Sequence, residues 1–442
     1  MINGKSQKIV WLEKMLRGMA VLVLKKYNPK IISVTGSVGK TSTKEAIYAV
    51  MASKFRVRKT EKNYNNEIGL PLTIIGAESG EDSLFGWGRV LLKWLWVVLA
   101  PIEYPEMLVL EMGADKPGDI EYLTSFVTSN AGVITDFSSS HIEFFKTIEG
   151  VAKEKSVLVK KLSASGLAVL NVDNPHVAKL ESQLKCNVVT FGFVPEAQMR
   201  ATDFSFSYVG EKQDLRGLSF KLNYKGTTLP VRLNNILAKH QIYSALAAVA
   251  VGTGFGINLV EAAAALENFS LPGGRMNLIL GMHKSYIIDD TYNASPVSVA
   301  AALNALGEIA ASSKQVARKI VVLGDMLELG EEEEERHREI GRKIMEVGCD
   351  FFVAVGGRMR LAGEELIQAG FAEEKVFYFA SPMEVGKKMK ELVAEGDYIL
   401  VKGSQGMRME KVVEELMQNP QEELKMLCRQ NKHWKEIAWK KV

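Results

Sequence analysis

The stretch that most constrains the fold of this chain runs from residue 31 to residue 47. A strand-like run at 31–34 leads into the sequence Thr-Gly-Ser-Val-Gly-Lys-Thr-Ser, and a helical pattern follows at once. Glycines let a backbone approach a polyphosphate, a helix N-terminus and a lysine attract its charge, and a threonine hydroxyl can bind Mg²⁺. The spacing Gly-x-x-Gly-Lys-Thr is two residues shorter than the common Walker pattern, yet the combination predicts nucleotide phosphate binding rather than a chance turn. The residues of this predicted phosphate loop are Gly36, Ser37, Val38, Gly39, Lys40, Thr41 and Ser42.

Composition excludes some classes of protein. With 442 residues, of which 47% are hydrophobic and 24% charged, the chain has enough material for two or three globular domains. A net charge of +3 does not indicate a nucleic-acid partner. The cysteines Cys186, Cys349 and Cys428 lie far apart without a paired spacing. They predict neither a metal site nor a disulfide framework, so we expect a cytoplasmic protein.

Strand-like and helix-like runs alternate along most of the sequence, which is typical of an α/β protein with mostly parallel sheets. We expect a doubly wound central domain with the phosphate loop over residues 31–270. A Rossmann-like α/β domain should follow over residues 271–442, with a hinge at 271–275 and a basic tail of helical character. Residues 203–233 alternate in the manner of antiparallel strands. The second domain has no Gly-x-Gly-x-x-Gly opening.

Two segments combine apolar and basic residues. Residues 1–30 contain a basic amphipathic helical pattern from 7 to 26, without the cleavage site of a secretory signal. Residues 84–100 hold three of the six tryptophans, are interrupted by Arg89 and Lys93, and are too short to span a bilayer comfortably. Two interpretations stay open for both segments. Each is either a helix packed on its own domain or a helix that docks on a membrane surface or a partner.

The residues also suggest a metal ligand. Glu111 ends the apolar run 107–110, and a carboxylate that leaves a strand beside a phosphate loop is a candidate ligand for Mg²⁺. A helix-capping or surface acid is an equal alternative for Glu111. His141 stands alone, and a lone histidine is more often structural than a ligand.

Eight motifs, taken together, resemble the Mur ligase family in order and spacing. They are most similar to its branch that adds D-alanyl-D-alanine, and the similarity covers roughly residues 31 to 415. The motifs are Thr-Gly-Ser-Val-Gly-Lys-Thr-Ser at 35–42, Asn-Asn-Glu-Ile-Gly-Leu-Pro at 65–71, Leu-Glu-Met-Gly-Ala at 110–114, Ser-His-Ile-Glu at 140–143, Pro-Gly-Gly-Arg at 272–275, Asp-Asp-Thr-Tyr-Asn-Ala-Ser-Pro at 289–296, Gly-Asp-Met-Leu-Glu-Leu-Gly at 324–330 and Val-Lys-Gly-Ser at 401–404.

The resemblance implies an enzyme that uses ATP and Mg²⁺ to phosphorylate a carboxylate, after which an amine attacks the acyl phosphate. The implied substrates are a peptidoglycan-precursor peptide and D-alanyl-D-alanine. Lys40 would neutralise charge during phosphoryl transfer, Thr41 and Glu111 would bind one Mg²⁺, and His141 would bind a second ion. Lys153 matches the place of a carbamylated lysine in several members, although Lys155 is close.

The resemblance also assigns residues to the nucleotide. Asn66 matches an asparagine near ATP, and Gln241 stands where the family usually has an adenine-side asparagine. Arg275 and Asp290 match residues that reach the nucleotide from the C-terminal domain after the domains close.

The sequence departs from the family at its start. Only residues 1–30 precede the phosphate loop, too few for the domain that binds a uridine nucleotide sugar in the D-alanyl-D-alanine-adding enzymes. Together with the two basic apolar segments at 7–26 and 84–100, this suggests peripheral contact with the inner face of a membrane and a lipid-linked acceptor. An equal alternative is that the two segments pack on each other and cover surface that the missing domain would have covered. The alternatives are a folylpolyglutamate-type ligase, a P-loop nucleotide switch and a catalytically inactive membrane scaffold.

Overall fold

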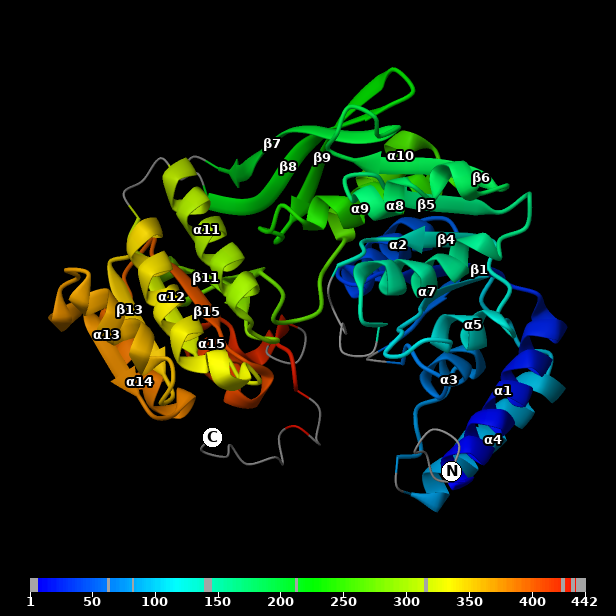
Figure 1. Cartoon of the computed structure of the whole chain (residues 1–442), viewed down its shortest axis with the longest axis horizontal. Coiled ribbons are helices and arrows are strands. Elements are labelled where there is room, and N and C mark those ends of the chain that lie inside the picture. Colours follow the sequence, from blue (N-terminus) through cyan, green and yellow to red (C-terminus); the bar gives the residue numbers. More distant parts are fainter. Residues whose placement is uncertain are drawn as a thin grey trace. The chain divides into compact units, whose positions relative to one another are not determined.

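The computed structural model describes residues 7–61, 64–81, 83–138, 145–210, 214–313, 317–422, 426–430 and 434. The chain forms two compact units, each described here by itself (Figure 1). The first unit consists of residues 1–204, 220–232 and 240–269. The second consists of residues 205–219, 233–239 and 270–442, so two segments that precede the expected hinge belong to it.

The first sheet follows the order β2-β3-β1-β4-β5-β6-β7-β8-β9. The strands from β2 to β7 pair in parallel, as the alternating sequence pattern predicted. The apolar residues of β1, β3 and β4, at the centre of this parallel part, are all buried because helices cover a parallel sheet. The strands of this sheet are β1 (Lys30–Thr35), β2 (Val57–Lys59), β3 (Met107–Glu111), β4 (Ala131–Ile134), β5 (Leu167–Asn171), β6 (Asn187–Gly192), β7 (Met199–Val209), β8 (Asp214–Tyr224) and β9 (Thr227–Asn234).

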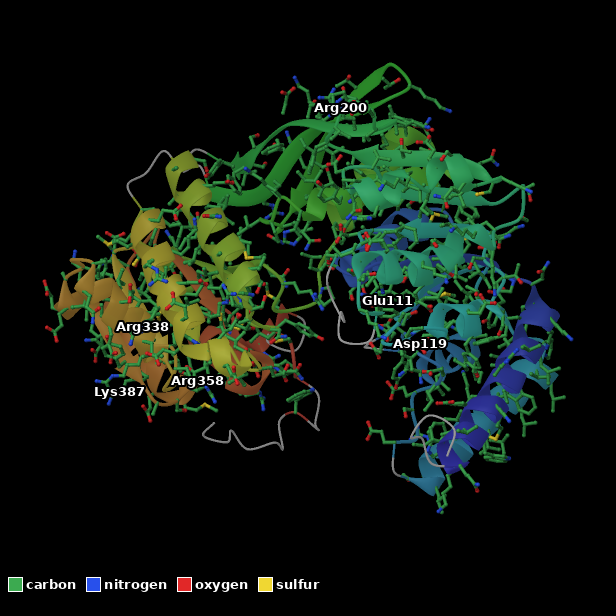
Figure 2. All side chains as sticks on the ribbon, in the orientation of Figure 1. Glu111, Asp119, Arg200, Arg338, Arg358 and Lys387 are labelled. Carbon is green, nitrogen blue, oxygen red and sulfur yellow. The ribbon has the colours of Figure 1, made fainter. Side chains whose placement is uncertain are left out.

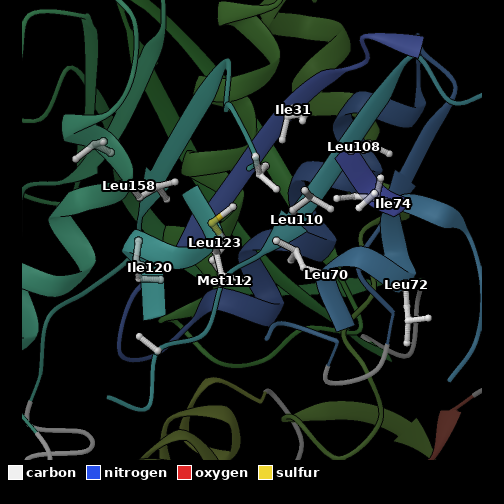
Figure 3. Packing of buried hydrophobic residues seen from close by; sticks show 14 of the residues in the cluster. Ile31, Leu70, Leu72, Ile74, Leu108, Leu110, Met112, Ile120, Leu123 and Leu158 are labelled. Atoms are coloured by element: carbon white, nitrogen blue, oxygen red, sulfur yellow. The ribbon is translucent and has the colours of Figure 1, made fainter. Parts of the chain in front are cut away.

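The helices of the first unit are, in the described residues, α1 (Gln7–Tyr27), α2 (Lys40–Ala52), α3 (Gly69–Ile75), α4 (Leu84–Leu99), α5 (Asp119–Thr124), α7 (Ile148–Lys160), α8 (Pro175–Ala178), α9 (Gln241–Gly254) and α10 (Leu259–Ala265). Helices α2 and α9 pack together. The core that supports the phosphate loop brings together side chains from α3, β3, α5 and α7, including Leu70, Leu110 and Leu158 (Figure 3).

The second sheet follows the order β10-β11-β15-β12-β13-β14, and all its pairs are parallel except β10 with β11. Successive residues of β12 enter different clusters: Val321 and Leu323 pack in one core, whereas Ile320 and Val322 pack in another. Because side chains alternate along a strand, this sheet is covered on both faces. Its strands are β10 (Asn277–Leu280), β11 (Tyr286–Asp290), β12 (Lys319–Gly324), β13 (Phe351–Val355), β14 (Val376–Phe379) and β15 (Tyr398–Lys402), and the helices of this unit are α11 (Pro296–Ser312), α12 (Glu333–Val347), α13 (Arg360–Gln368), α14 (Pro382–Leu392) and α15 (Glu410–Leu416).

The two basic apolar segments are helices, α1 and α4, that lie side by side (Figure 1). Helix α1 buries Leu16, Met19, Ala20 and Val23 in the first core. Within the part of the chain that the structure describes, neither these nor any other helix combines the length and the apolar character needed to cross a bilayer.

Most of the expected tail lies outside the described residues, but residues 426–430 pack into the second unit. The guanidinium of Arg429 donates to the carbonyl of Tyr292 at 2.9 Å and to Glu410 Oε2 at 2.7 Å. The indole of Trp434 lies next to the guanidinium groups of Arg408 and Arg429. This part of the tail therefore belongs to the fold and is not a solvated extension.

Candidate functional site

The phosphate loop lies between the end of β1 and the start of α2, as predicted. A Cβ added to Gly36 would lie 2.0 Å from Thr135 Oγ1, so only glycine fits there without movement of β4 or the loop. Gly39 has φ +80° and precedes the first turn of α2, a backbone conformation that favours glycine. Glycine is therefore required at the two positions for different reasons. At Gly36 the reason is the close approach of Thr135, and at Gly39 it is the left-handed backbone conformation.

Residues after β4 hold the loop in place. The amide of Ser37 donates to the carbonyl of Asp136 at 2.8 Å, and Thr135 Oγ1 donates to the carbonyl of Val38 at 2.6 Å. Lys40 Nζ lies over the loop, 2.9 Å from the carbonyl of Gly36 and 3.1 Å from that of Ser37. The positive charge of Lys40 therefore lies at the mouth of the loop, where it can neutralise the charge of a bound phosphate.

Glu111 is buried, with 4% of its side chain exposed (Figure 2). It pairs in register with Val34, so it ends its strand next to the start of the loop. Its Oε1 accepts a hydrogen bond of 3.1 Å from Asn65 Nδ2, while its own amide donates to Thr60 Oγ1 at 3.0 Å. A carboxylate fixed in this way at the carboxyl edge of the sheet has the chemistry of a Mg²⁺ ligand.

Helix α7 presents two charged residues inward. Glu154 accepts hydrogen bonds from the amides of Gly118 and Ile120, at 2.9 and 2.8 Å, and so caps the first turn of α5. Lys155 is 1% exposed, and burial, followed by the charge of Lys40, lowers the pKa of Lys155 to about 8.

The two lysines of α7 differ in burial. The side chain of Lys153 is exposed, because residues 153 and 155 lie on opposite sides of α7. Lys155 is the buried lysine whose charge interacts with Lys40, so the geometry favours Lys155 over Lys153 at this site.

Gln241 lies in the first turn of α9 and is buried. Its Oε1 is 3.5 Å from Ser244 Oγ, which in turn lies 3.1 Å from Thr43 Oγ1 on α2. Its Nε2 lies 3.0 Å from His240 Nε2. This chain of contacts joins Gln241 to the helix that follows the phosphate loop.

Arg275 and Asp290 lie in the second unit. The guanidinium of Arg275 stacks over the ring of Tyr292, 4.2 Å from its centroid, and its buried Nε has no hydrogen-bond partner among the described residues. Asp290 Oδ2 forms a 2.6 Å ion pair with Lys402 Nζ, which also donates to the carbonyl of Asn293 at 2.8 Å. Its neighbour Asp289 is fully buried, and burial raises the pKa of Asp289 to about 6.

Asn66, Thr41, Ser42 and His141 are the remaining predicted site residues. Asn66 is exposed, and its Oδ1 accepts from the amide of Gly69 at 2.9 Å, so it forms the turn that begins α3. Its neighbour Asn65 is the residue that contacts Glu111, and sequence reasoning did not single it out. Thr41 lies in the first turn of α2 and is half-buried, whereas Ser42 is buried. His141 lies outside the described residues.

Comparison with known proteins identifies the family. The profile of the Mur ligase middle domain matches residues 34–85 and 97–252, and that of the Mur ligase glutamate ligase domain matches residues 274–405. The middle-domain match is interrupted at 86–96, which is most of α4. Helix α4 is therefore an addition to the pattern that the family shares.

Two curated relatives carry the same name. The chain is 33% identical over 405 residues to the UDP-N-acetylmuramoyl-tripeptide--D-alanyl-D-alanine ligase of Bacillus subtilis, with 92% of this chain and 79% of the relative covered. It is 29% identical to the ligase of that name from Escherichia coli, with 91% and 80% covered.

Solved structures agree with these relatives. A structure of MurF from Acinetobacter baumannii superposes with a TM-score of 0.75 at 25% identity, covering 92% of this chain and 81% of the other. The MurF ligase from Thermotoga maritima, in complex with ADP, superposes with a TM-score of 0.69 at 26% identity, covering 93% and 84%. The predicted α/β fold, with its central nucleotide-binding domain and second α/β domain, is thereby confirmed, and the chain belongs to the Mur ligase family.

Proposed function

We propose that this chain is an ATP-dependent ligase that adds D-alanyl-D-alanine to the carboxylate of a peptidoglycan-precursor peptide. The observation that carries the proposal is the phosphate loop with Lys40 at its mouth and the buried carboxylate of Glu111 on the adjacent strand. The substrates are those named for the Bacillus subtilis and Escherichia coli relatives, whose alignments cover 92% and 91% of this chain.

The proposed chemistry has two steps. A carboxylate oxygen attacks the γ-phosphorus of ATP, the bond to the bridging oxygen breaks, and ADP leaves. The amine nitrogen then attacks the acyl carbon, an amide bond forms, the amine loses a proton, and phosphate departs with its oxygen. The loop amides and Lys40 hold the phosphates and neutralise the charge that moves onto the leaving group.

The residues beside the loop fit Mg²⁺. Hydroxyl and carboxylate oxygens are its preferred ligands, and Thr41 and Glu111 supply one of each close to the loop. When bound, the ion neutralises phosphate charge and so favours attack by the carboxylate. Asn65 holds Glu111 in position through its hydrogen bond.

Lys155 is the proposed site of carbamylation, in place of Lys153. A pKa near 8 leaves a substantial part of the amine neutral at physiological pH. The neutral amine attacks CO₂, a nitrogen–carbon bond forms, and loss of a proton leaves a carbamate, which is an additional oxygen ligand. Carbon-13 NMR with labelled bicarbonate tests this: a carbamate signal should appear in the native chain and in Lys153→Met, and not in Lys155→Met.

We also propose that the enzyme works in the cytoplasm, at the inner face of the membrane, with the segments 7–26 and 84–100 in peripheral contact. Both segments are surface helices of the first unit with exposed apolar and basic residues. Such a location suits an acceptor peptide carried on a lipid.

The test of the ligase is phosphate release from ATP in the presence of Mg²⁺ and D-alanyl-D-alanine. The acceptor is offered as a UDP-linked muramoyl tripeptide, as the same peptide on a lipid, or free. Release should require both acceptor and amine, and the product should gain the mass of the dipeptide. Release without the amine would instead indicate a nucleotide switch, and activity with glutamate on a folate would indicate the folylpolyglutamate type.

A further inference from the structure

Helix α4 has two apolar faces. Its inner face carries Trp87, Val90, Trp94 and Val97 at spacings of three and four residues, and Val90 and Val97 are buried in the first core. Its outer face carries apolar side chains that are all exposed, with Leu92 at 66% and Trp96 at 60%. The members of this outer face are Leu84, Phe85, Leu92, Leu95, Trp96 and Leu99. One apolar stripe is enough to pack a surface helix on its domain, so the outer face calls for a separate explanation.

Helix α1 holds this face in a fixed orientation. The indole nitrogen of Trp94 donates to the carbonyl of Met19 at 3.1 Å, and the hydroxyl of Tyr27 donates to the carbonyl of Val97 at 2.7 Å. Lys26 Nζ donates to the carbonyls of Val98 and Ala100, both at 2.9 Å, and so caps the C-terminus of α4. These contacts place the two helices in parallel, as a braced pair on the surface of the first unit (Figure 1).

The charges on the pair have one sign at the surface. Helix α4 contains Arg89 and Lys93, both exposed, and no acidic residue. In α1 the exposed charged residues are Lys8, Lys14, Lys25 and Lys26, and its single acid, Glu13, is half-buried. Trp11 and Leu22 of α1 are exposed between these lysines. The exposed acids Glu81 and Glu103 stand before and after α4 and outside both helices. Within the helices, exposed apolar side chains with tryptophan lie beside exposed basic residues, which is typical of a helix that lies in the surface of an anionic bilayer.

We propose that the outer face of α4, braced by α1, docks flat on an anionic lipid surface. Leu92, Leu95, Trp96 and Leu99 would enter the boundary between headgroups and acyl chains, and Arg89 and Lys93 would contact the headgroup phosphates. The exposed charges of both helices, which are all basic, favour an anionic lipid surface over a second protein as the occupant. The inference makes the membrane contact of the proposed function specific to one helix face, and it is independent of the ligase chemistry.

The experiment is flotation of the full chain with vesicles of phosphatidylglycerol and phosphatidylcholine, compared with vesicles of phosphatidylcholine alone. We expect binding to the anionic vesicles, and binding at least tenfold weaker to the zwitterionic ones. Leu92→Gln/Trp96→Gln and Arg89→Glu/Lys93→Glu should each weaken binding by about tenfold or more. Val260→Gln and Lys387→Glu, which change an exposed valine and an exposed lysine elsewhere, should leave binding unchanged.

Three results would overturn the inference: no flotation of the native chain, equal flotation with both vesicle types, or full binding by both outer-face variants. A dimer in sedimentation equilibrium that Leu92→Gln/Trp96→Gln abolishes, without vesicle binding, would assign the face to a second copy instead. ATP-dependent ligation of a soluble acceptor is measured in the same variants. Because the outer face contains no residue of the phosphate loop, that activity should be retained, so failure of docking and failure of the ligase are separate outcomes.

Discussion

The side-chain amide of Asn65 donates a 3.1 Å hydrogen bond to Oε1 of Glu111. This hydrogen bond fixes the orientation of the carboxylate. Because Asn65 holds Oε1, the direction of Oε2 is fixed as well. Groups that orient a metal ligand often affect metal affinity nearly as much as the ligand itself.

We expect Asn65→Ala to raise the Mg²⁺ concentration needed for half-maximal activity by about tenfold to a hundredfold. The matched control is Asn66→Ala, which removes the turn before α3 and should lower the free energy of unfolding by about 1 kcal/mol without that shift in Mg²⁺ dependence. Titration of activity with Mg²⁺, together with thermal unfolding, separates the two effects. Equal behaviour of the two variants would contradict the assignment.

Lys40→Ala should lower kcat/KM by about 100-fold to 1000-fold, because the loop loses its cation. Its thermal unfolding should change little, since the side chain is half-buried and its ammonium lies over the loop, 2.9 Å from the carbonyl of Gly36 and 3.1 Å from that of Ser37. Val38→Ala, at an exposed position of the same loop, should retain activity. Steady-state kinetics of the native chain, Lys40→Ala and Val38→Ala measure these effects. Substantial turnover by Lys40→Ala would contradict a role of this lysine in phosphoryl transfer.

Lys155 should make stability depend on pH in a specific direction. Its pKa of about 8 in the folded chain lies below the ordinary lysine value of 10.5, so between these two values the unfolded chain binds the extra proton. The contribution of Lys155 to stability therefore rises from pH 8 to about pH 10.5, and below pH 8 its full cost, about 3 kcal/mol, is present.

In bicarbonate-free buffer, Lys155→Met should accordingly be more stable than the native chain at pH 7, and the difference should shrink as the pH approaches 10.5. Denaturant unfolding at a series of pH values measures this difference. Lys153→Met is the control, because that exposed side chain should show no such trend. A difference that stays constant with pH would be inconsistent with a depressed pKa.

Asp290 and Lys402 form an ion pair in the second unit, and the effects of replacing them on the free energy of unfolding should be coupled. Both side chains are largely buried, so Lys402→Met leaves an unpaired carboxylate and should lower the free energy of unfolding by about 3 kcal/mol. The double variant Asp290→Asn/Lys402→Met should be more stable than Lys402→Met alone. A double-mutant cycle in denaturant measures the coupling, and additivity of the two single changes would mean that the pair is independent.

The local parts of the structure were predictable from the sequence. The phosphate loop is specified within a dozen residues, and the apolar run that ends at Glu111 forms the strand 107–111, all of whose residues are buried. The helical character of 7–26 and 84–100 was equally evident, and the structure extends it to Tyr27 and ends it at Leu99.

Choices between neighbouring residues were not predictable. Lys153 and Lys155 differ by two positions on one helix, and only the packing of α7 against the first sheet determines which is buried. Asn65 contacts Glu111, whereas Asn66 forms the turn before α3 because that helix begins at Gly69. The contact of Lys402 with Asp290 joins residues 112 positions apart, although a lysine at the end of a buried strand was a signal that it has a partner.

The second apolar face of α4 also affects how the protein can be handled. Salts that strengthen apolar association, such as ammonium sulfate, should precipitate the native chain at a lower salt concentration than they precipitate Leu92→Gln/Trp96→Gln. A mild detergent that covers the same face should restore solubility, so yield and crystallisation will depend on what covers that face of the helix.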